Sequence, residues 1–158
     1  MIDKINDFVL KLSSIKEERE IIEFTLDYVM EILKSESATY FSANDNKKIL
    51  TFEIVRGPNN DILLGVSFSY EGVVGWCARH KKNIIVKNVD ENPEFTKKVD
   101  YVTKNKTKSI ISVVLINGEK LKGVFEFINP KDRDFFTDED FKIAETLINI
   151  SSLKIGWN

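Results

Sequence analysis

The chain has 158 residues, of which 42% are hydrophobic and 30% charged, and its formal net charge at pH 7 is -2. This length fits a single domain, and the hydrophobic content is sufficient for a substantial core. The near balance of acidic and basic residues argues against a protein that binds nucleic acid or an anionic membrane surface through an excess of positive charge.

The sequence also indicates where the protein is located and how its domain is organised. The sequence has no apolar run of the roughly 20 residues that a membrane-spanning helix needs, and no long apolar stretch follows Met1, so we expect neither a membrane anchor nor a secretory signal. The single cysteine, Cys77, cannot form an internal disulfide, which favours the reducing cytoplasm. We expect one domain over residues 1–158, with an N-terminal helix in 1–16 and the core in 17–158.

Two helices are predicted at the N-terminus. Apolar residues recur at helical spacing from Ile2 to Leu12, and Ser13-Ser14 interrupts this pattern. Residues 17–34 carry two apolar stripes, whereas a helix on the surface of a domain needs only one. The members of the two stripes are Ile22, Leu26, Val29 and Leu33, and Ile21, Phe24, Tyr28 and Ile32.

The following segment is typical of β structure. Residues 37–43 and 48–55 are predicted strands joined by a polar turn, and Gly57-Pro58 begins a second turn signal. Residues 61–68 alternate in polarity, which predicts a strand with four side chains on one face: Ile62, Leu64, Val66 and Phe68.

The second half of the chain predicts a helix over 72–81, a short strand over 84–87, and a helix with a loop over 91–105. Residues 109–116 and 120–128 are expected to form a hairpin, because Asn117-Gly118 between them suits a type I′ turn.

The last helix is predicted to begin after Thr137, which with Asp140 forms a capping-box pattern. This helix also carries two apolar stripes. We therefore expect the terminal helices to pack one stripe on the sheet and the other on a second copy of the chain, since large apolar patches are unusual on a monomer. A small monomer with apolar helices is the alternative.

Two groups of short motifs identify a family resemblance that extends from about Ile21 to Ile155. In order and spacing they resemble a GAF domain. They are Glu-Gly-Val-Val-Gly-Trp at 71–76, with 83–89 and 92–95, and Thr107–Leu115, with 123–129 and 136–140. The resemblance implies an α+β fold of the GAF-like (profilin/PAS-like) type. A central antiparallel sheet of about six strands would carry the terminal helices on one face and short helices and loops over the ligand face.

The same resemblance implies a pocket between one face of the sheet and the helices that follow the third and fourth strands. An aromatic cluster with a few hydroxyl groups there could stack on a flat heterocycle, or could simply fill the space. The implied lining residues are Tyr40 or Phe41 (one of which must face inward), Phe68, Tyr70, Gly72, Val73, Trp76, Val89, Phe95, Tyr101, Ser109 and Ile111.

The glycines at the start of the 72–81 helix have two interpretations. A glycine inside a helix costs about 1 kcal/mol relative to alanine, which is tolerable where a ligand must approach the backbone. The free N–H groups of the helix N-terminus near Gly72 and Val73 would then meet a polar or phosphate-like group. The alternative is close packing of this helix on the sheet.

A cyclic nucleotide is a possible but disfavoured ligand. Cyclic-nucleotide-binding members of the family carry Asn, Lys, Phe, Asp and Glu around the final strand and helix. This chain has Asn129, Phe136 and Asp140, but Pro130 stands at the Lys position and Phe141 at the Glu position. Asn129 and Asp140 have a structural alternative, which is to tie the last strand to the last helix.

No bilin, haem or metal site is predicted. Cys77 and His80 lie three residues apart, but a metal site would need two further ligands and the sequence has no other Cys or His. Bilin-carrying relatives attach the pigment to a cysteine in another segment, and Cys77 does not match that pattern. The one cysteine also argues against the methionine sulfoxide reduction that some relatives perform with several cysteines.

The sequence therefore predicts a regulatory or sensory domain and not an enzyme. An unidentified small molecule would bind between the sheet and helix 72–81, and the terminal helices would pass the signal on as part of a homodimer. The first alternative is a ligand-free dimerisation or protein-interaction module whose pocket is filled by side chains. The second is a thiol-dependent enzyme that uses Cys77.

Overall fold

The computed structural model describes residues 1–58, 60–92 and 106–157. They form an α+β fold around a six-stranded sheet in the order β3-β2-β1-β6-β5-β4, in which each neighbouring pair is antiparallel. This confirms the predicted fold class. The strands are β1 (Ser35–Asn44), β2 (Ile49–Arg56), β3 (Ser67–Ser69), β4 (Ile84–Val86), β5 (Ile110–Asn117) and β6 (Lys120–Pro130).

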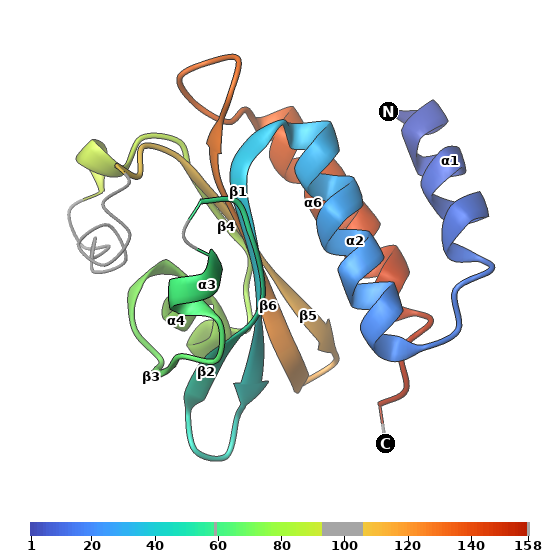
Figure 1. Cartoon of the computed structure of the whole chain (residues 1–158), viewed down its shortest axis with the longest axis horizontal. Coiled ribbons are helices and arrows are strands. Elements are labelled where there is room, and N and C mark those ends of the chain that lie inside the picture. Colours follow the sequence, from blue (N-terminus) through green and yellow to red (C-terminus); the bar gives the residue numbers. More distant parts are fainter. Residues whose placement is uncertain (59, 93–105, 158) are drawn as a thin grey trace.

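Helices cover the sheet on both faces, as Figure 1 shows. On one face α2 (Glu18–Leu33) and α6 (Asp138–Ser152) lie side by side, with α1 (Ile2–Leu12) outside them. On the other face lie α4 (Gly72–His80), the one-turn helix α3 (Asn60–Leu63) and the 3-10 turn η1 (Val89–Glu91). Within the described residues no helix is both long enough and apolar enough to span a bilayer.

The core under α2 and α6 explains why these helices carry two apolar stripes. One stripe packs on the sheet, where Phe125 and Phe127 are fully buried. Part of the second stripe of α2 is covered by α1 of the same chain, because Phe8 stacks on Phe24 with ring centroids 5.2 Å apart and meets Tyr28 edge-on at 5.0 Å. Contact with a second copy is therefore not needed to bury Phe24 and Tyr28.

The predicted strand over 61–68 is wrong for most of its length. The chain forms α3 instead and returns to the edge of the sheet at Gly65 and Val66, which exchange backbone hydrogen bonds with Phe52 just before β3. Glycines with positive φ flank this detour, Gly57 at 104° and Gly65 at 85°, and they let the backbone leave the extended conformation. The single turn of helix buries Leu63 and leaves three of the alternating residues exposed: Ile62 at 56%, Leu64 at 59% and Val66 at 45%.

The hairpin between β5 and β6 is confirmed, but its turn is not of type I′. Asn117 pairs with Lys120, so the two central residues are Gly118 and Glu119. Only Gly118, at φ 62°, has a positive φ, which fits the type II′ turn with glycine in the first central position. The strand prediction for 84–87 corresponds to β4, whereas most of the helix and loop expected over 91–105 falls outside the described residues.

Candidate functional site

Helix α4 forms the roof of the candidate site, and its two glycines have different roles. Gly72 begins the helix with φ 67°, a value that favours glycine, and a side chain there would meet open space. At Gly75 a Cβ atom would overlap the backbone of Tyr70. Close packing therefore explains Gly75, while Gly72 satisfies the backbone geometry at the entry of the helix. Val73, Val74, Cys77 and Ala78 are all buried.

The floor of the site is a row of buried polar side chains on the face of the sheet that α4 covers. Glu126 on β6 is paired directly with Thr39 on β1 and with Ser112 on β5. Their residues are 9%, 7% and 0% exposed, respectively. Since paired residues of neighbouring strands point to the same face, the three side chains lie in one line across the centre of the sheet.

Cys77 on α4 lies close to this row. Burial raises the pKa of its thiol to about 12, with the Glu126 carboxylate acting in the same direction and the Ser112 hydroxyl in the opposite one. A fully buried thiol with a raised pKa is a poor nucleophile. Among the described residues, no group of three or more His, Cys, Asp or Glu side chains could hold a metal ion.

Several residues that the resemblance implied as pocket lining do lie on the α4 face. Phe41, Phe68 and Tyr70 belong to the apolar cluster beneath α4, with Trp76 at its margin. A second cluster, at the β4 and β5 end, contains Val73 and Val89. Phe95 and Tyr101 fall outside the described residues.

Tyr40 and Ile111 lie on the opposite face, in the core under α2 and α6. Of the pair Tyr40 and Phe41, it is therefore Phe41 that faces α4, with a register shift against β2 between the two. The Tyr40 ring lies over Gly123, where a side chain would overlap its hydroxyl, and this hydroxyl donates to the carbonyl of Lys122 at 3.2 Å.

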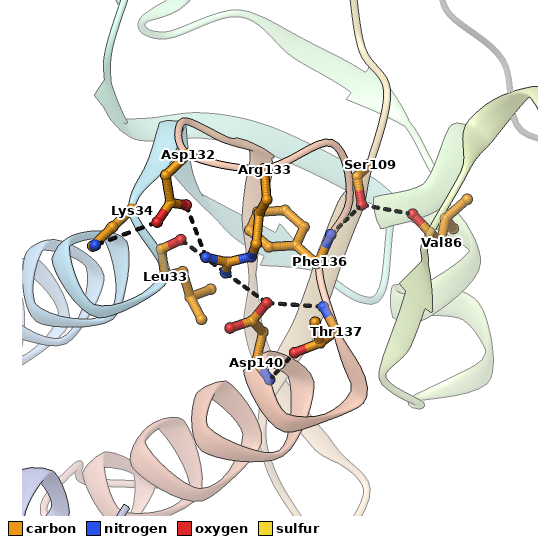
Figure 2. Close-up of polar contacts among 9 residues, drawn as sticks. All are labelled: Leu33, Lys34, Val86, Ser109, Asp132, Arg133, Phe136, Thr137 and Asp140. Atoms are coloured by element: carbon orange, nitrogen blue, oxygen red, sulfur yellow. Dashed lines mark hydrogen bonds and ion pairs between the residues drawn. The ribbon is translucent and has the colours of Figure 1, made fainter.

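Ser109 joins three elements at the edge of the site instead of lining the pocket. Figure 2 shows its hydroxyl between β4 and the loop that enters α6. Ser109 Oγ donates to the carbonyl of Val86 at 3.4 Å and accepts from the backbone N–H of Phe136 at 3.0 Å. The hydroxyl is fully buried, so it satisfies a backbone group that would otherwise be orphaned.

The partial cyclic-nucleotide motif also has a structural role. Asn129 Oδ1 accepts from the backbone N–H groups of Lys108 at 2.8 Å and Ser109 at 3.1 Å, which ties β6 to the start of β5. Asp140 accepts from Arg133 at 2.6 Å and from the N–H of Thr137 at 2.8 Å. The capping box at Thr137 is confirmed. Arg133, four residues beyond Asn129, supplies the positive charge that pairs with Asp140 (Figure 2). The sequence showed only Pro130 at the Lys position of the motif and did not point to Arg133.

Asp45, in the β1–β2 turn, fixes the far end of the roof helix. Its carboxylate accepts from the Tyr70 hydroxyl at 2.9 Å and from Lys81 at 3.1 Å, and Lys81 is the C-cap of α4. Burial acts to raise the pKa of Asp45, but hydrogen bonds from Lys81, Tyr70 and Lys48 outweigh it and hold the pKa below its usual value. Arg79 donates to the carbonyl of Tyr70. These contacts hold α4 against the β1–β2 hairpin.

An open hollow of about 730 Å³ lies at the loop between β6 and α6. Its lining carries both charges, and Lys87 and Asp138 pair across it at 3.0 Å. The residues around it are Lys87, Arg133, Asp134, Phe135, Phe136, Thr137, Asp138 and Glu139. Of these residues, only Phe136 was considered for ligand binding from the sequence, as part of the disfavoured cyclic-nucleotide motif.

Sequence reasoning missed the polar floor. Thr39, Ser112 and Glu126 were not among the predicted lining residues, although one signal was present. Glu126 interrupts the apolar run of residues 123–128, and a charged residue inside an otherwise buried strand marks a position with a specific partner or a functional role.

Comparisons with known proteins agree with this architecture. The chain matches the family model of the GAF domain over residues 16–153. It is also similar to the rod cGMP-specific 3',5'-cyclic phosphodiesterase subunit alpha of Bos taurus, with 29% identity over 110 residues. The human counterpart is 33% identical over 82 residues. The bovine match covers 70% of this chain but only 12% of the relative.

Two solved structures show the same fold at low sequence identity. The GAF domain of a phosphoenolpyruvate-protein phosphotransferase from Coxiella burnetii has a TM-score of 0.81 at 12% identity, covering 97% of this chain and 90% of that one. The free methionine-R-sulfoxide reductase of Neisseria meningitidis, in complex with its substrate, has a TM-score of 0.74 at 15% identity, covering 93% and 83%. The match of the family model to most of the sequence shows that this chain belongs to the GAF domain family, whose members are regulatory and sensory modules that bind small molecules.

Proposed function

We propose that this domain is a receptor for a small molecule that donates hydrogen bonds, bound on the α4 face of the sheet. The observation that carries the proposal is the row formed by Thr39, Glu126 and Ser112 beneath α4. A carboxylate and two hydroxyl groups can together accept several N–H or O–H groups from one ligand. The apolar surroundings of the row would supply the remaining contact area.

The energetic argument rests on the cost of burying polar groups. A hydroxyl moved out of water without a compensating hydrogen bond costs about 1–3 kcal/mol in proteins. Ser112 Oγ is buried, and apart from the weak Cys77 thiol it has no hydrogen-bond partner among the described residues. A protein that needed only stability would place an apolar residue there, so the retained hydroxyl supports a binding role.

We propose that ligand binding is coupled to α6 through the hydrogen bonds of Ser109. This residue connects β4, next to the roof, with the loop that begins α6. A ligand that changes the position of α4 and β4 would alter the packing of α6, and the terminal helices would carry the change to a second copy. We also propose a cytoplasmic location, since the reducing cytoplasm keeps a lone thiol free.

A thermal-shift screen tests the binding proposal. The first probes are cGMP and cAMP, because the names of the phosphodiesterase relatives point to cyclic nucleotides, followed by other nucleotides, amino acids and organic acids. A ligand at 100 times its Kd should stabilise the folded state by about 2.7 kcal/mol.

Two variants make the screen specific to the floor. Glu126→Gln should abolish the shift, whereas Glu119→Gln, in the exposed turn of the β5–β6 hairpin, should preserve it. A shift that survives in Glu126→Gln would place the ligand elsewhere. Sedimentation at micromolar concentration tests the dimer, and a purely monomeric mass would remove it from the proposal.

The ligand-free interaction module stays as a second candidate, because three aromatic rings crowd one part of the α4 face. Phe41, Phe52 and Phe68 pack against one another with ring centroids 4.6 to 5.7 Å apart. Such a cluster fills space that a ligand would otherwise use. If no probe shifts the melting temperature and the protein sediments as a dimer, this second function is favoured. The burial of Cys77 gives no support to a thiol-dependent enzyme.

A further inference from the structure

Helix α1 is fixed to the body of the domain by few contacts. Two of its side chains, Phe8 and Leu12, are buried, while Ile2 and Leu10 are each 73% exposed. Its polar contacts on α2 come from the Tyr28 hydroxyl, which donates to Asp7 at 2.7 Å and to the carbonyl of Lys4 at 3.1 Å. An isolated helix of 11 residues is marginal in water, so α1 depends on its docking to stay folded.

The C-terminal end of α1 is capped by a side chain from the other end of the chain. Lys154 Nζ donates to the carbonyls of Leu12 at 2.8 Å, Ser13 at 3.2 Å and Ile15 at 2.5 Å. An ammonium group has three N–H donors, and all three are used here. The last carbonyls of a helix lack partners within the helix and attract a positive charge, so Lys154 both caps α1 and holds the turn toward α2.

The segment that carries Lys154, residues 153–157, is itself held in a defined position. Ile155 is buried, and the ring nitrogen of Trp157 donates to the carbonyl of Ser152 at 3.0 Å. Lysines of β6 reach the same segment: Lys120 donates to the carbonyl of Trp157 at 3.0 Å, and Lys122 to that of Gly156 at 3.2 Å.

Because this segment follows α6 directly, its position depends on the position of α6. Lys122 also pairs with Glu18 at the start of α2, at 2.6 Å. Residues 153–157 therefore lie where three elements meet: the start of α2, the end of α6 and the end of β6 nearest the hairpin turn.

We propose that residues 153–157 act as a latch that holds α1 closed over α2, and that withdrawal of Lys154 releases α1 while the sheet stays folded. Release exposes Phe8 together with the aromatic surface of Phe24 and Tyr28 that α1 covers. Movement of α6 relative to α2 is the event that would open the latch. This device does not depend on a ligand, so it stands or falls separately from the proposed receptor function.

Hydrogen exchange of backbone amides tests the latch with three variants. In Lys154→Met, which removes all three hydrogen bonds of Lys154, amides of residues 4–12 should exchange at least about tenfold faster than in the wild type, since the loss of even one hydrogen bond to a charged group gives about this ratio. Lys142→Met removes an exposed lysine of α6 and should leave the exchange unchanged. Lys154→Arg, which keeps the charge and the donors, should restore most of the protection.

Two results would overturn the latch. One is equal protection of α1 in Lys154→Met and Lys142→Met. The other is faster exchange to the same extent in β5 and β6, which would mean a global loss of stability and not a local opening. Phe8→Ala is the positive control because it removes the main docking contact of α1. If this variant also fails to raise exchange in α1 above that in the strands, α1 is not a separable unit.

Discussion

The face of the sheet under α2 and α6 is lined by fully buried apolar residues such as Phe125, Phe127 and Val113, whereas the face under α4 has a buried polar row at its centre. A polar pair in the helical layer is internally satisfied, because Thr25 and Ser151 share a hydrogen bond of 2.6 Å. On the α4 face, the only partner of Ser112 Oγ among the described residues is the weakly hydrogen-bonding Cys77 thiol.

We infer from this difference that the two faces of the sheet serve different purposes. Apolar burial on the helical side supplies most of the driving force for folding. On the other side, the buried Ser112 hydroxyl has only the weak Cys77 thiol as a partner among the described residues, and we propose that this side supplies contacts for binding. Substitutions on the face under α2 and α6 should therefore cause large losses of stability. Substitutions on the face under α4 should mainly weaken binding.

The largest expected effect is on the helical face. Phe125→Ala should lower the free energy of unfolding by about 3–5 kcal/mol, because it removes a fully buried ring and leaves a cavity. Urea denaturation followed by circular dichroism measures this loss. Phe68→Ala, at a half-buried position on the α4 face, is the matched control and should cost clearly less. Equal losses at the two positions would contradict the contrast between the faces.

The second effect concerns the junction between the faces. Ser109→Ala should lower the free energy of unfolding by about 1–3 kcal/mol, because the buried N–H of Phe136 loses its acceptor. Ser35→Ala is a matched control, since Ser35 is equally buried and its hydroxyl has no partner among the described residues. Chemical denaturation under identical conditions should show a larger loss of unfolding free energy for Ser109→Ala than for Ser35→Ala. Similar losses would show that the Ser109 hydroxyl does not stabilise the junction.

The third effect depends on pH and concerns the clamp on α4. Asp45→Asn should cost about 0.5–1 kcal/mol at pH 7, because Lys81 and Tyr70 lose a charged acceptor. The folded state holds the pKa of Asp45 below its ordinary value of 3.8. The stabilisation is therefore fully present above pH 3.8 and is lost as the pH falls through the lower folded-state pKa.

Denaturation of the wild type and of Asp45→Asn between pH 7 and pH 3 measures this dependence. The difference between the two proteins should stay constant down to about pH 4 and then shrink. A difference that grows as the pH falls would show that the carboxylate is not stabilised by its partners.

The smallest effect on stability is expected at the polar floor. Ser112→Ala should change the free energy of unfolding by less than about 0.5 kcal/mol, or raise it, because the removed hydroxyl has only the weak Cys77 thiol as a partner among the described residues. The same variant should weaken binding of any probe that shifts the melting temperature of the wild type. A large loss of stability, comparable with that of Ser109→Ala, would show that the hydroxyl is structural.

Much of the fold could be predicted because its signals are local and periodic. The apolar spacing in residues 17–34, the capping box at Thr137 and the hairpin around Gly118 each depend on a few neighbouring residues. The detour through α3 was missed because a period of two over residues 61–68 also fits a loop with one helical turn, and the positive φ of Gly57 and Gly65 is not visible in a pattern of polarity.

The site was predicted less completely because the direction of a side chain depends on register. The resemblance could not decide between Tyr40 and Phe41, and the register shift between them determines which one faces α4. Ile111 and Ser112 are neighbours in sequence but point to opposite faces, so the predicted residue lies in the helical core and its neighbour in the polar floor. Pairing with Glu126, a long-range contact, is what brings Ser112 and Thr39 into one row.

A crystal structure of the protein purified directly from the cells that produce it tests the central claim most directly. The account predicts electron density for a small molecule beneath α4, within hydrogen-bond distance of Ser112 Oγ and of the Glu126 carboxylate. If side chains of the chain itself fill that space, or if a small molecule binds on another part of the surface, the assignment of the polar row as the binding floor is contradicted.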